Sequence, residues 1–288
     1  MPINIKEMFL KKISYGGETP ARPGNQALTV SVINQKGGCG KTTTVINLSA
    51  CLVELGKKVL VIDIDPQAHA TLGLGIQLDG SAKSLYHVLV NPEVPISVSV
   101  RETYHDCLRL IPSHSLLSSA QIDLIDIIGR ENLLRQKLSA IKGEYDFIFI
   151  DCPPSLNLLT LNALTASDGL IIPIQTHFYS LNGMSELLNT VEIVKRRLNP
   201  NLEILGVLPT LFDKRTRTNH QILKAVKEYF KGNIRVFETT VHNCISLAES
   251  PIHGKPIIKF RRNSRGSEDY RNLAKEVAGI IEERKAIK

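Results

Sequence analysis

One stretch, residues 28–49, restricts the fold of this chain more than any other part of the sequence. Its first six residues form a largely apolar, β-branched run that is typical of a buried strand. From residue 41 onwards, apolar residues recur at helical spacing. Three glycines between the two runs (Gly37, Gly38 and Gly40) let the backbone turn tightly and approach an anion without Cβ clashes. A strand, a glycine turn and a helix in this order predict an α/β unit with an anion site at the turn.

The residue types at this turn indicate what it binds. The sequence Gly-Lys-Thr closes the turn, and the loop amides and the positive end of the helix dipole favour an anion there. Lys41 is placed to reach the β- and γ-phosphates of a nucleotide, and the Thr42 hydroxyl is placed to ligate Mg²⁺. The stretch therefore predicts a P-loop. The residues predicted to contact the phosphates are Gly37, Gly38, Cys39, Gly40, Lys41, Thr42 and Thr43.

Acidic residues follow two further strands. Asp63 and Asp65 come at the end of a strand expected over residues 58–64. Asp151 ends an apolar run over residues 147–150. Because parallel sheets gather ligand sites at the carboxyl ends of their strands, we expect these carboxylates beside the P-loop. We predict that Asp65 orients the attacking water, that Asp63 lies in the outer shell of the magnesium, and that Asp151 contacts the magnesium through water.

The size and composition favour one large α/β core. The chain has 288 residues, 43% of them apolar, and shows no polar linker after residue 27. We expect a flexible arm at residues 1–27 and a single domain over residues 28–288. The five cysteines include no CxxC pair, so we expect free thiols. No apolar run approaches the roughly 18–20 residues of a membrane span, and we expect a cytoplasmic protein.

Apolar runs and periodicities along the rest of the chain predict alternating strands and helices. Further strands are expected over residues 108–111, 170–174, 202–208 and 236–241. Further helices are expected over residues 116–126, 131–141, 157–166, 181–198, 221–230 and 268–284. This order predicts an α/β fold with a mostly parallel, twisted sheet and helices on both faces.

Four segments resemble the ParA/MinD class of P-loop ATPases. Lys36-Gly37-Gly38-Cys39-Gly40-Lys41-Thr42-Thr43 resembles the deviant Walker A box of the class. Residues 63–67 (Asp-Ile-Asp-Pro-Gln) resemble its second box, and residues 149–154 (Phe-Ile-Asp-Cys-Pro-Pro) resemble its Walker B box. The stretch from Ala248 to Pro256 is similar to a C-terminal segment of ParA proteins in particular. The resemblance covers roughly residues 28–284 and implies the fold of a deviant Walker P-loop ATPase.

The resemblance to ParA implies an ATPase that forms a homodimer when it binds ATP with Mg²⁺. Lys36 would cross to the nucleotide of the partner subunit and act as an arginine finger does elsewhere, so Lys36, Lys41 and Asp65 form the predicted catalytic set. The ATP-bound dimer would bind DNA without sequence preference. A ParB-like centromere-binding partner would stimulate weak hydrolysis and release the dimer from the nucleoid. Such cycles would partition plasmid or chromosome copies, as in the short family type without an N-terminal DNA-binding domain.

One run departs from the ParA pattern. Many family members place arginines and an asparagine just before the C-terminal segment, where they serve DNA binding and contact adenine. This chain has His242-Asn243-Cys244-Ile245-Ser246 there, so neither role is assigned to the run. The net charge of +7 still permits contact with a polyanion, and two other stretches concentrate basic residues. The predicted DNA-binding residues are Lys214, Arg215, Arg217, Arg261, Arg262 and Arg265.

Other functions remain open from the sequence. The same ATPase could position a protein cargo, such as a chemoreceptor cluster or a microcompartment, and only the neighbouring genes would separate that function from DNA partition. A MinD-like membrane switch needs an anchor, but the last helix ends in mixed charge without aromatic residues. We therefore predict no contact with a membrane. An iron–sulfur reductase would require a cluster-binding cysteine pair, for which the cysteine spacing gives no support.

Overall fold

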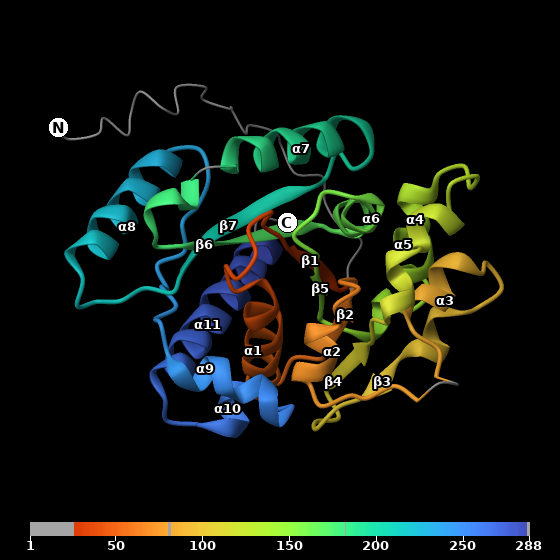
Figure 1. Cartoon of the computed structure of the whole chain (residues 1–288), viewed down its shortest axis with the longest axis horizontal. Helices are drawn as coiled ribbons and strands as arrows, with labels where there is room; N and C mark the ends of the chain where they lie inside the picture. The colour runs from red at the N-terminus through yellow and green to blue at the C-terminus, as the bar shows by residue number, and fades with distance from the viewer. Residues whose placement is uncertain (1–25, 80–81, 182, 287–288) are drawn as a thin grey trace.

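The chain folds around a seven-stranded sheet in a computed structural model that describes residues 26–79, 82–181 and 183–286 (Figure 1). The arm predicted at residues 1–27 lies outside the described residues except for its last two, and the single domain expected over 28–288 stays a prediction. The strands are β1 (Leu28–Val32), β2 (Val59–Asp63), β3 (Arg101–Glu102), β4 (Leu108–Ile111), β5 (Phe147–Asp151), β6 (Gly169–Gln175) and β7 (Glu203–Thr210). Their order across the sheet is β3-β4-β2-β5-β1-β6-β7.

The pairing of the strands places several carboxyl ends together. Neighbouring strands run parallel except β3, a two-residue edge strand that pairs antiparallel with β4. The position of β1 between β5 and β6 brings the loop after β1 to the middle of the carboxyl edge. In the register of β2 with β5, Asp63 lies directly opposite Asp151. The mostly parallel sheet is confirmed, and its topology joins the segments that carry the predicted motifs.

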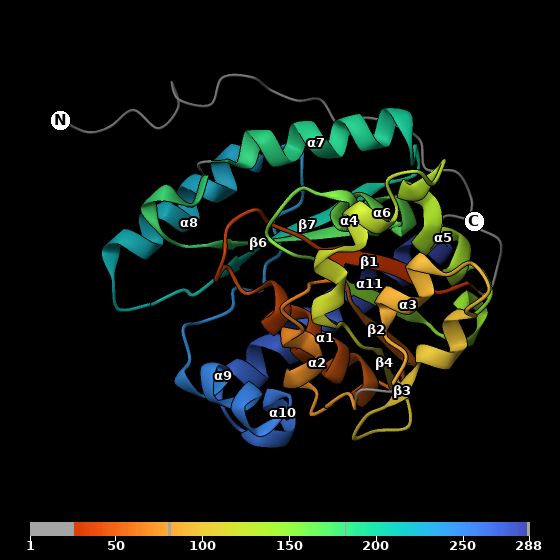
Figure 2. The same ribbon diagram turned by 45° about the vertical axis from the view of Figure 1, so that its right-hand side comes forward.

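Helices cover both faces of the sheet, as predicted (Figure 2). They are α1 (Lys41–Glu54), α2 (His69–Gly73), α3 (Leu85–Val90), α4 (Ala120–Asp123), α5 (Leu133–Leu138), α6 (Leu158–Ala166), α7 (Met184–Arg197), α8 (Arg217–Phe230), α9 (Ile245–Glu249), α10 (Ile257–Phe260) and α11 (Arg265–Ala286). On one face, Leu48 of α1 and Leu273 of α11 share an apolar cluster with Val30 and Val32 of β1. The apolar residues of α3 to α8 pack on the other face. Among the described helices, none combines the length and apolar character that crossing a membrane requires.

The strand β5 shows why the apolar runs of this sequence form buried parallel strands. Phe147 and Phe149 belong to the layer beneath α1 and α11, whereas Ile148 and Ile150 belong to the layer beneath α3 to α8. All four side chains are buried. Because both faces of the strand are covered, the run is apolar throughout instead of alternating between apolar and polar residues.

The helix predicted over residues 116–126 does not form as one element. The segment has a 3-10 turn at Ser115–Ser118, followed by the short helix α4. Ile122 and Ile125 remain 73% and 59% exposed. The apolar spacing there is not matched by a surface to pack on, and isolated helical turns are unstable without such packing.

The strand predicted over residues 236–241 is also wrong. Within the segment, only one isolated bridge (Val236 with Val207) and single backbone hydrogen bonds from Phe237 and Val241 join it to β7. The backbone amides of Glu238 and Thr239 instead donate to the Glu276 carboxylate of α11, at 2.8 and 3.2 Å. A side chain from a helix has therefore taken the place of a strand partner, which no pattern within the segment could reveal.

Candidate nucleotide-binding site

A cleft of about 470 Å³ opens at the carboxyl edge of the sheet. Its floor is the loop between β1 and α1, and its walls come from the segments that follow β2, β5 and β7. A concave site of this volume suits a small molecule or cofactor. The residues that line it are Gly37, Gly38, Gly40, Lys41, Thr42, Thr43, Asp65, Gln67, His69, Pro154, Thr210, Leu211, Val241, His242, Asn243, Cys244, Leu247, Ala248 and Tyr270.

The loop at the floor has a conformation that only glycine adopts easily. Gly38 and Gly40 have φ angles of 70° and 92°, in the left-handed region. The Gln175 side chain at the end of β6 donates to the Gly38 carbonyl at 2.9 Å. The Thr210 hydroxyl at the end of β7 donates to the Cys39 carbonyl at 2.8 Å. These bonds fix the loop to the ends of two strands.

The two lysines of the loop have different positions. Lys41 begins α1, lines the cleft and is only 7% exposed; its ammonium group donates to the Lys36 carbonyl at 3.2 Å. Lys36 is not among the residues that line the cleft, and its own amide donates to the Asn34 side chain at 2.9 Å. The Cys39 side chain is buried away from the cleft. Lys41 therefore faces the cleft, whereas Lys36 lies outside its lining.

Asp63 and Asp151 are fully buried at the ends of β2 and β5. Burial raises the pKa of both carboxyls, to about 7 for Asp63 and well above the usual range for Asp151. For Asp63, the Thr71 hydroxyl and amide oppose this by donating to one oxygen at 2.7 and 2.8 Å. For Asp151, the nearby charge of Asp63 raises the pKa further, while the Thr42 hydroxyl lowers it.

The surroundings of Asp151 fit a hydrated Mg²⁺. Neither carboxylate oxygen has a hydrogen-bond partner of ordinary geometry, although the Thr42 hydroxyl lies close enough to lower its pKa. A buried carboxylate in this state is unfavourable unless a cation or water compensates it. The described residues contain no group of three or more His, Cys, Asp or Glu that could hold a metal alone. A magnesium ion would therefore depend on Thr42, on Asp151 through water, and on the phosphates of the nucleotide.

Asp65 is the carboxylate that faces the cleft. Its side chain is 8% exposed, and one of its oxygens accepts from the Gln67 amide at 3.0 Å. Asp63, by contrast, has both oxygens engaged, one by Thr71 and the other by the Asp65 amide at 3.2 Å. This arrangement suits the predicted role of Asp65 toward a water molecule. The outer-shell role of Asp63 stays a prediction.

The far wall of the cleft comes from the C-terminal part of the chain, which the sequence reasoning left unassigned. The run from His242 to Cys244 and the Tyr270 ring line this wall. Tyr270 is 1% exposed, and its hydroxyl shares a hydrogen bond of 3.2 Å with the Thr44 hydroxyl of α1, 226 positions away in sequence. The only available signal was the position of residues 242–246 just before the segment that resembles ParA.

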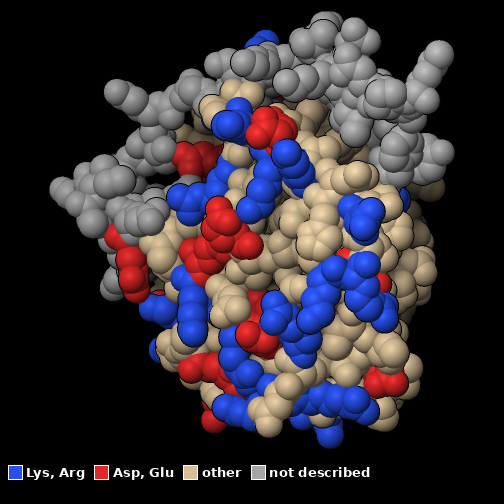
Figure 3. All heavy atoms as spheres, turned by 90° about the vertical axis from the view of Figure 1, so that its left-hand side faces the viewer, with Lys and Arg blue, Asp and Glu red and all other residues tan. Residues whose placement is uncertain are grey.

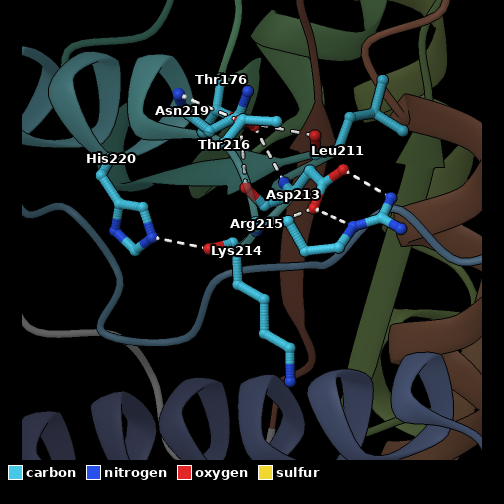
Figure 4. A network of polar contacts seen from close by, with 8 residues as sticks. All are labelled: Thr176, Leu211, Asp213, Lys214, Arg215, Thr216, Asn219 and His220. Atoms are coloured by element: carbon cyan, nitrogen blue, oxygen red, sulfur yellow. Dashed lines mark hydrogen bonds and ion pairs between the residues drawn. The ribbon is translucent and has the colours of Figure 1, made fainter.

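All six residues predicted to bind DNA are exposed, but three of them have acidic partners. The ion pairs are Arg215 with Asp213 at 2.8 Å, Arg262 with Glu54 at 3.3 Å and Arg265 with Asp269 at 3.0 Å. Within the described part of the chain, Lys214, Arg217 and Arg261 have no such partner. Figure 4 shows the Lys214 side chain extending away from the Asp213–Arg215 pair. Lys and Arg side chains gather on the face that Figure 3 presents.

Comparison with known proteins places this geometry in context. The sequence profile of an AAA domain matches residues 27–204. The chain is 48% identical over 249 residues to the sporulation initiation inhibitor protein Soj of Bacillus subtilis, covering 86% of this chain and 97% of Soj. It is 43% identical over 248 residues to the chromosome partitioning protein ParA of Myxococcus xanthus, covering 86% and 87% of the two chains. Among solved structures, cobyrinic acid a,c-diamide synthase of Mycobacterium smegmatis with bound ADP and magnesium is similar, with a TM-score of 0.76, 34% identity and coverage of 88% and 94%.

Proposed function

We propose, because this chain belongs to the ParA family of P-loop ATPases, that it binds and hydrolyses ATP and that its ATP-bound homodimer binds DNA in a partition cycle. The observation that carries this proposal is the meeting of three motifs in one cleft. Lys41 and Asp65 line the cleft, and the unpartnered Asp151 carboxylate lies beside Thr42 at its floor. These residues are separated in sequence, and together they supply the charges that phosphoryl transfer needs.

Each of these residues has a role in the proposed hydrolysis. Lys41 and the amides at the start of α1 hold the β- and γ-phosphates. Thr42, and Asp151 through water, would hold the magnesium ion, which when bound would neutralise negative charge on the phosphates. Asp65 accepts a hydrogen bond from the attacking water and orients it toward the γ-phosphate.

Lys36 supplies the link between ATP and dimerisation in this proposal. Its side chain does not line the cleft of its own subunit, which leaves it available to the nucleotide of a partner subunit. Two nucleotides that face each other across an interface repel unless positive charge lies between them. A lysine from each subunit supplies that charge, and the γ-phosphate supplies the partner that holds the lysine at the interface, so ATP acts as a switch for assembly.

DNA binding without sequence preference requires only contacts to phosphates. The exposed Lys214, Arg217 and Arg261 support such binding, since they have no acidic partner within the described residues. A ParB-like protein would complete the cycle by stimulating hydrolysis, after which the dimer separates and leaves the nucleoid. This part of the proposal rests on the relatedness to Soj and ParA.

Substitutions in the cleft test the assignment of roles. Lys41→Ala should weaken ATP binding by about 10- to 100-fold, the loss expected for a charge-assisted hydrogen bond. Asp65→Ala should bind ATP almost normally but hydrolyse it about 10²- to 10⁴-fold more slowly, as expected when a positioned acid–base group is removed. Binding of a fluorescent ATP analogue and single-turnover hydrolysis measure the two effects separately.

Two further variants complete this experiment. Lys58→Ala removes an exposed lysine outside the cleft and should leave both measurements unchanged. Lys36→Ala should bind ATP but fail to form the ATP-dependent dimer, as judged by light scattering. Normal hydrolysis by Asp65→Ala would refute the role of Asp65, and an ATP-dependent dimer of normal activity in Lys36→Ala would refute the role of Lys36.

A further inference from the structure

Four buried residues, one of them Asp65, form a closed ring of hydrogen bonds next to the cleft. The Ser113 hydroxyl donates to the Asp65 carbonyl at 2.5 Å, and the Asp65 amide donates to Asp63 at 3.2 Å. The Thr71 hydroxyl donates to the other oxygen of Asp63 at 2.7 Å. The Ser113 amide closes the ring by donating to the Thr71 hydroxyl oxygen at 3.0 Å. The ring joins the end of β2, the helix α2 and the residue that follows β4 by two positions.

The ring excludes solvent and leaves Ser113 fully engaged. Ser113 is 1% exposed and Thr71 is 2% exposed, so water does not compete for these bonds. Ser113 uses both its amide and its hydroxyl as donors within the ring. The Asp65 carbonyl also accepts from the Ala68 amide at 2.9 Å, and Ala68 has a left-handed φ of 56°. Loop residues in such a conformation persist when surrounding contacts determine them.

We infer that Ser113 is a positioning residue for Asp65. Its hydroxyl fixes the peptide carbonyl of Asp65 to the segment just after β4, and β4 is fixed to β2 by parallel pairing. With its main chain held in this way, Asp65 keeps a fixed position at the edge of the cleft, and this position determines where its carboxylate lies. Ser113 itself is not among the residues that line the cleft, so it acts through Asp65. The inference rests on the proposed function, in which Asp65 orients the attacking water.

The inference predicts a separation between binding and hydrolysis. Ser113→Ala keeps the P-loop, Thr42 and Asp151 intact, so affinity for ATP should remain within about threefold of the wild type. The single-turnover hydrolysis rate should fall by about 10- to 100-fold, because displacing a catalytic group by about 1 Å has an effect of that size. Both quantities are measured on the full chain with ATP and Mg²⁺.

A matched control separates positioning from simple loss of a buried hydroxyl. Ser99 is also fully buried, and its hydroxyl also donates to a backbone carbonyl, that of Ser84 at 3.3 Å, away from the cleft. Ser99→Ala should leave the hydrolysis rate unchanged, whatever it does to stability. A fall in hydrolysis in Ser99→Ala as large as that in Ser113→Ala would overturn the inference.

A double variant tests whether Ser113 acts through Asp65. In an Asp65→Ala background, Ser113→Ala should cause no further loss of hydrolysis, because effects that pass through one group do not add. A further loss of the same size as in the wild-type background would overturn the inference, as would normal hydrolysis by Ser113→Ala alone. Failure of the proposed function would look different: the wild type would not hydrolyse ATP, or Asp65→Ala would hydrolyse it normally.

Discussion

Asp151 lies fully buried at the end of β5, with neither carboxylate oxygen in a hydrogen bond of ordinary geometry. Burial and the charge of Asp63 raise its pKa above the ordinary 3.8. The folded protein therefore keeps a proton on Asp151 at pH values where the unfolded chain has lost it. Unfolding releases that proton, so the contribution of Asp151 to stability falls as the pH rises from about 4 through its raised pKa. The ionised carboxylate therefore lowers stability, and under the proposed function the same group would hold magnesium.

Asp151→Asn should accordingly stabilise the protein free of nucleotide and metal at pH 8, by about 0.5–2 kcal/mol. The gain should be much smaller at pH 4, where the folded wild type keeps the proton and the unfolded chain, with an ordinary pKa of 3.8, is close to half protonated. The same variant should lose magnesium-dependent ATP binding. Urea unfolding at the two pH values measures the stability difference. Equal or lower stability of the variant at pH 8 would contradict the assignment of a charge penalty to this residue.

Two glycines bring together elements that are far apart in the chain. Gly75 follows α2, and Gly254 follows the 3-10 turn Ser250–His253 after α9. A Cβ atom on Gly254 would lie 2.6 Å from the Gly75 Cα atom, and one on Gly75 would lie 2.9 Å from the Gly254 carbonyl oxygen. The next segment is tied to α1, because the Ile257 amide donates to the Asn47 side chain at 2.7 Å. The segment that resembles ParA is therefore part of the packing around α1 and α2.

Gly254→Ala should destabilise the protein by more than the conformational penalty alone. Gly254 has a φ of 59°, which costs an alanine about 1–2 kcal/mol. The close approach to Gly75 should add about 1–3 kcal/mol of overpacking. Gly232→Ala is the matched control, because its φ is 79° and nothing lies within 4 Å of an added Cβ. Equal destabilisation of the two variants in urea unfolding would show that the contact with Gly75 is unimportant.

The elements that the sequence predicted well are those whose cause is local. The strands β2 and β5 are continuous apolar runs up to their final aspartate, and β1 and β4 are largely apolar. The P-loop is a contiguous motif, so the strands and the loop could be located without a structure. Parallel pairing then explains why Asp65 reaches the same cleft as Lys41. Residues 236–241 do not form the expected strand because Glu276 of α11 binds their backbone, and the wall of the cleft includes Tyr270 of the same helix. No local pattern contains such long-range contacts.

At the scale of the whole molecule, the segment between β7 and α8 connects the cleft directly with one of the basic stretches. The chain that leaves β7 first holds the P-loop through Thr210 and then lines the cleft at Leu211. It next forms a loop that carries Lys214 (Figure 4) and enters α8 at Arg217. Under the proposed function, a nucleotide bound in the cleft would lie next to Leu211, at the base of this loop. The Asn219 side chain steadies the loop by accepting from the Asp213 amide at 2.9 Å. Under the proposed function, this continuity lets the bound nucleotide influence how the basic residues meet DNA.

The measurement to make is binding of the full chain to random-sequence duplex DNA with ATP, with ADP and without nucleotide, over a series of salt concentrations. We predict binding only with ATP, weakening steeply with salt because phosphate contacts release counterions. Substituting Lys214 and Arg217 together with alanine should reduce the slope of log affinity against log salt by about 2, whereas substituting Lys58 and Arg135 should not change it. Binding that is independent of the nucleotide, or no binding in any state, would contradict an ATP-gated DNA-binding dimer.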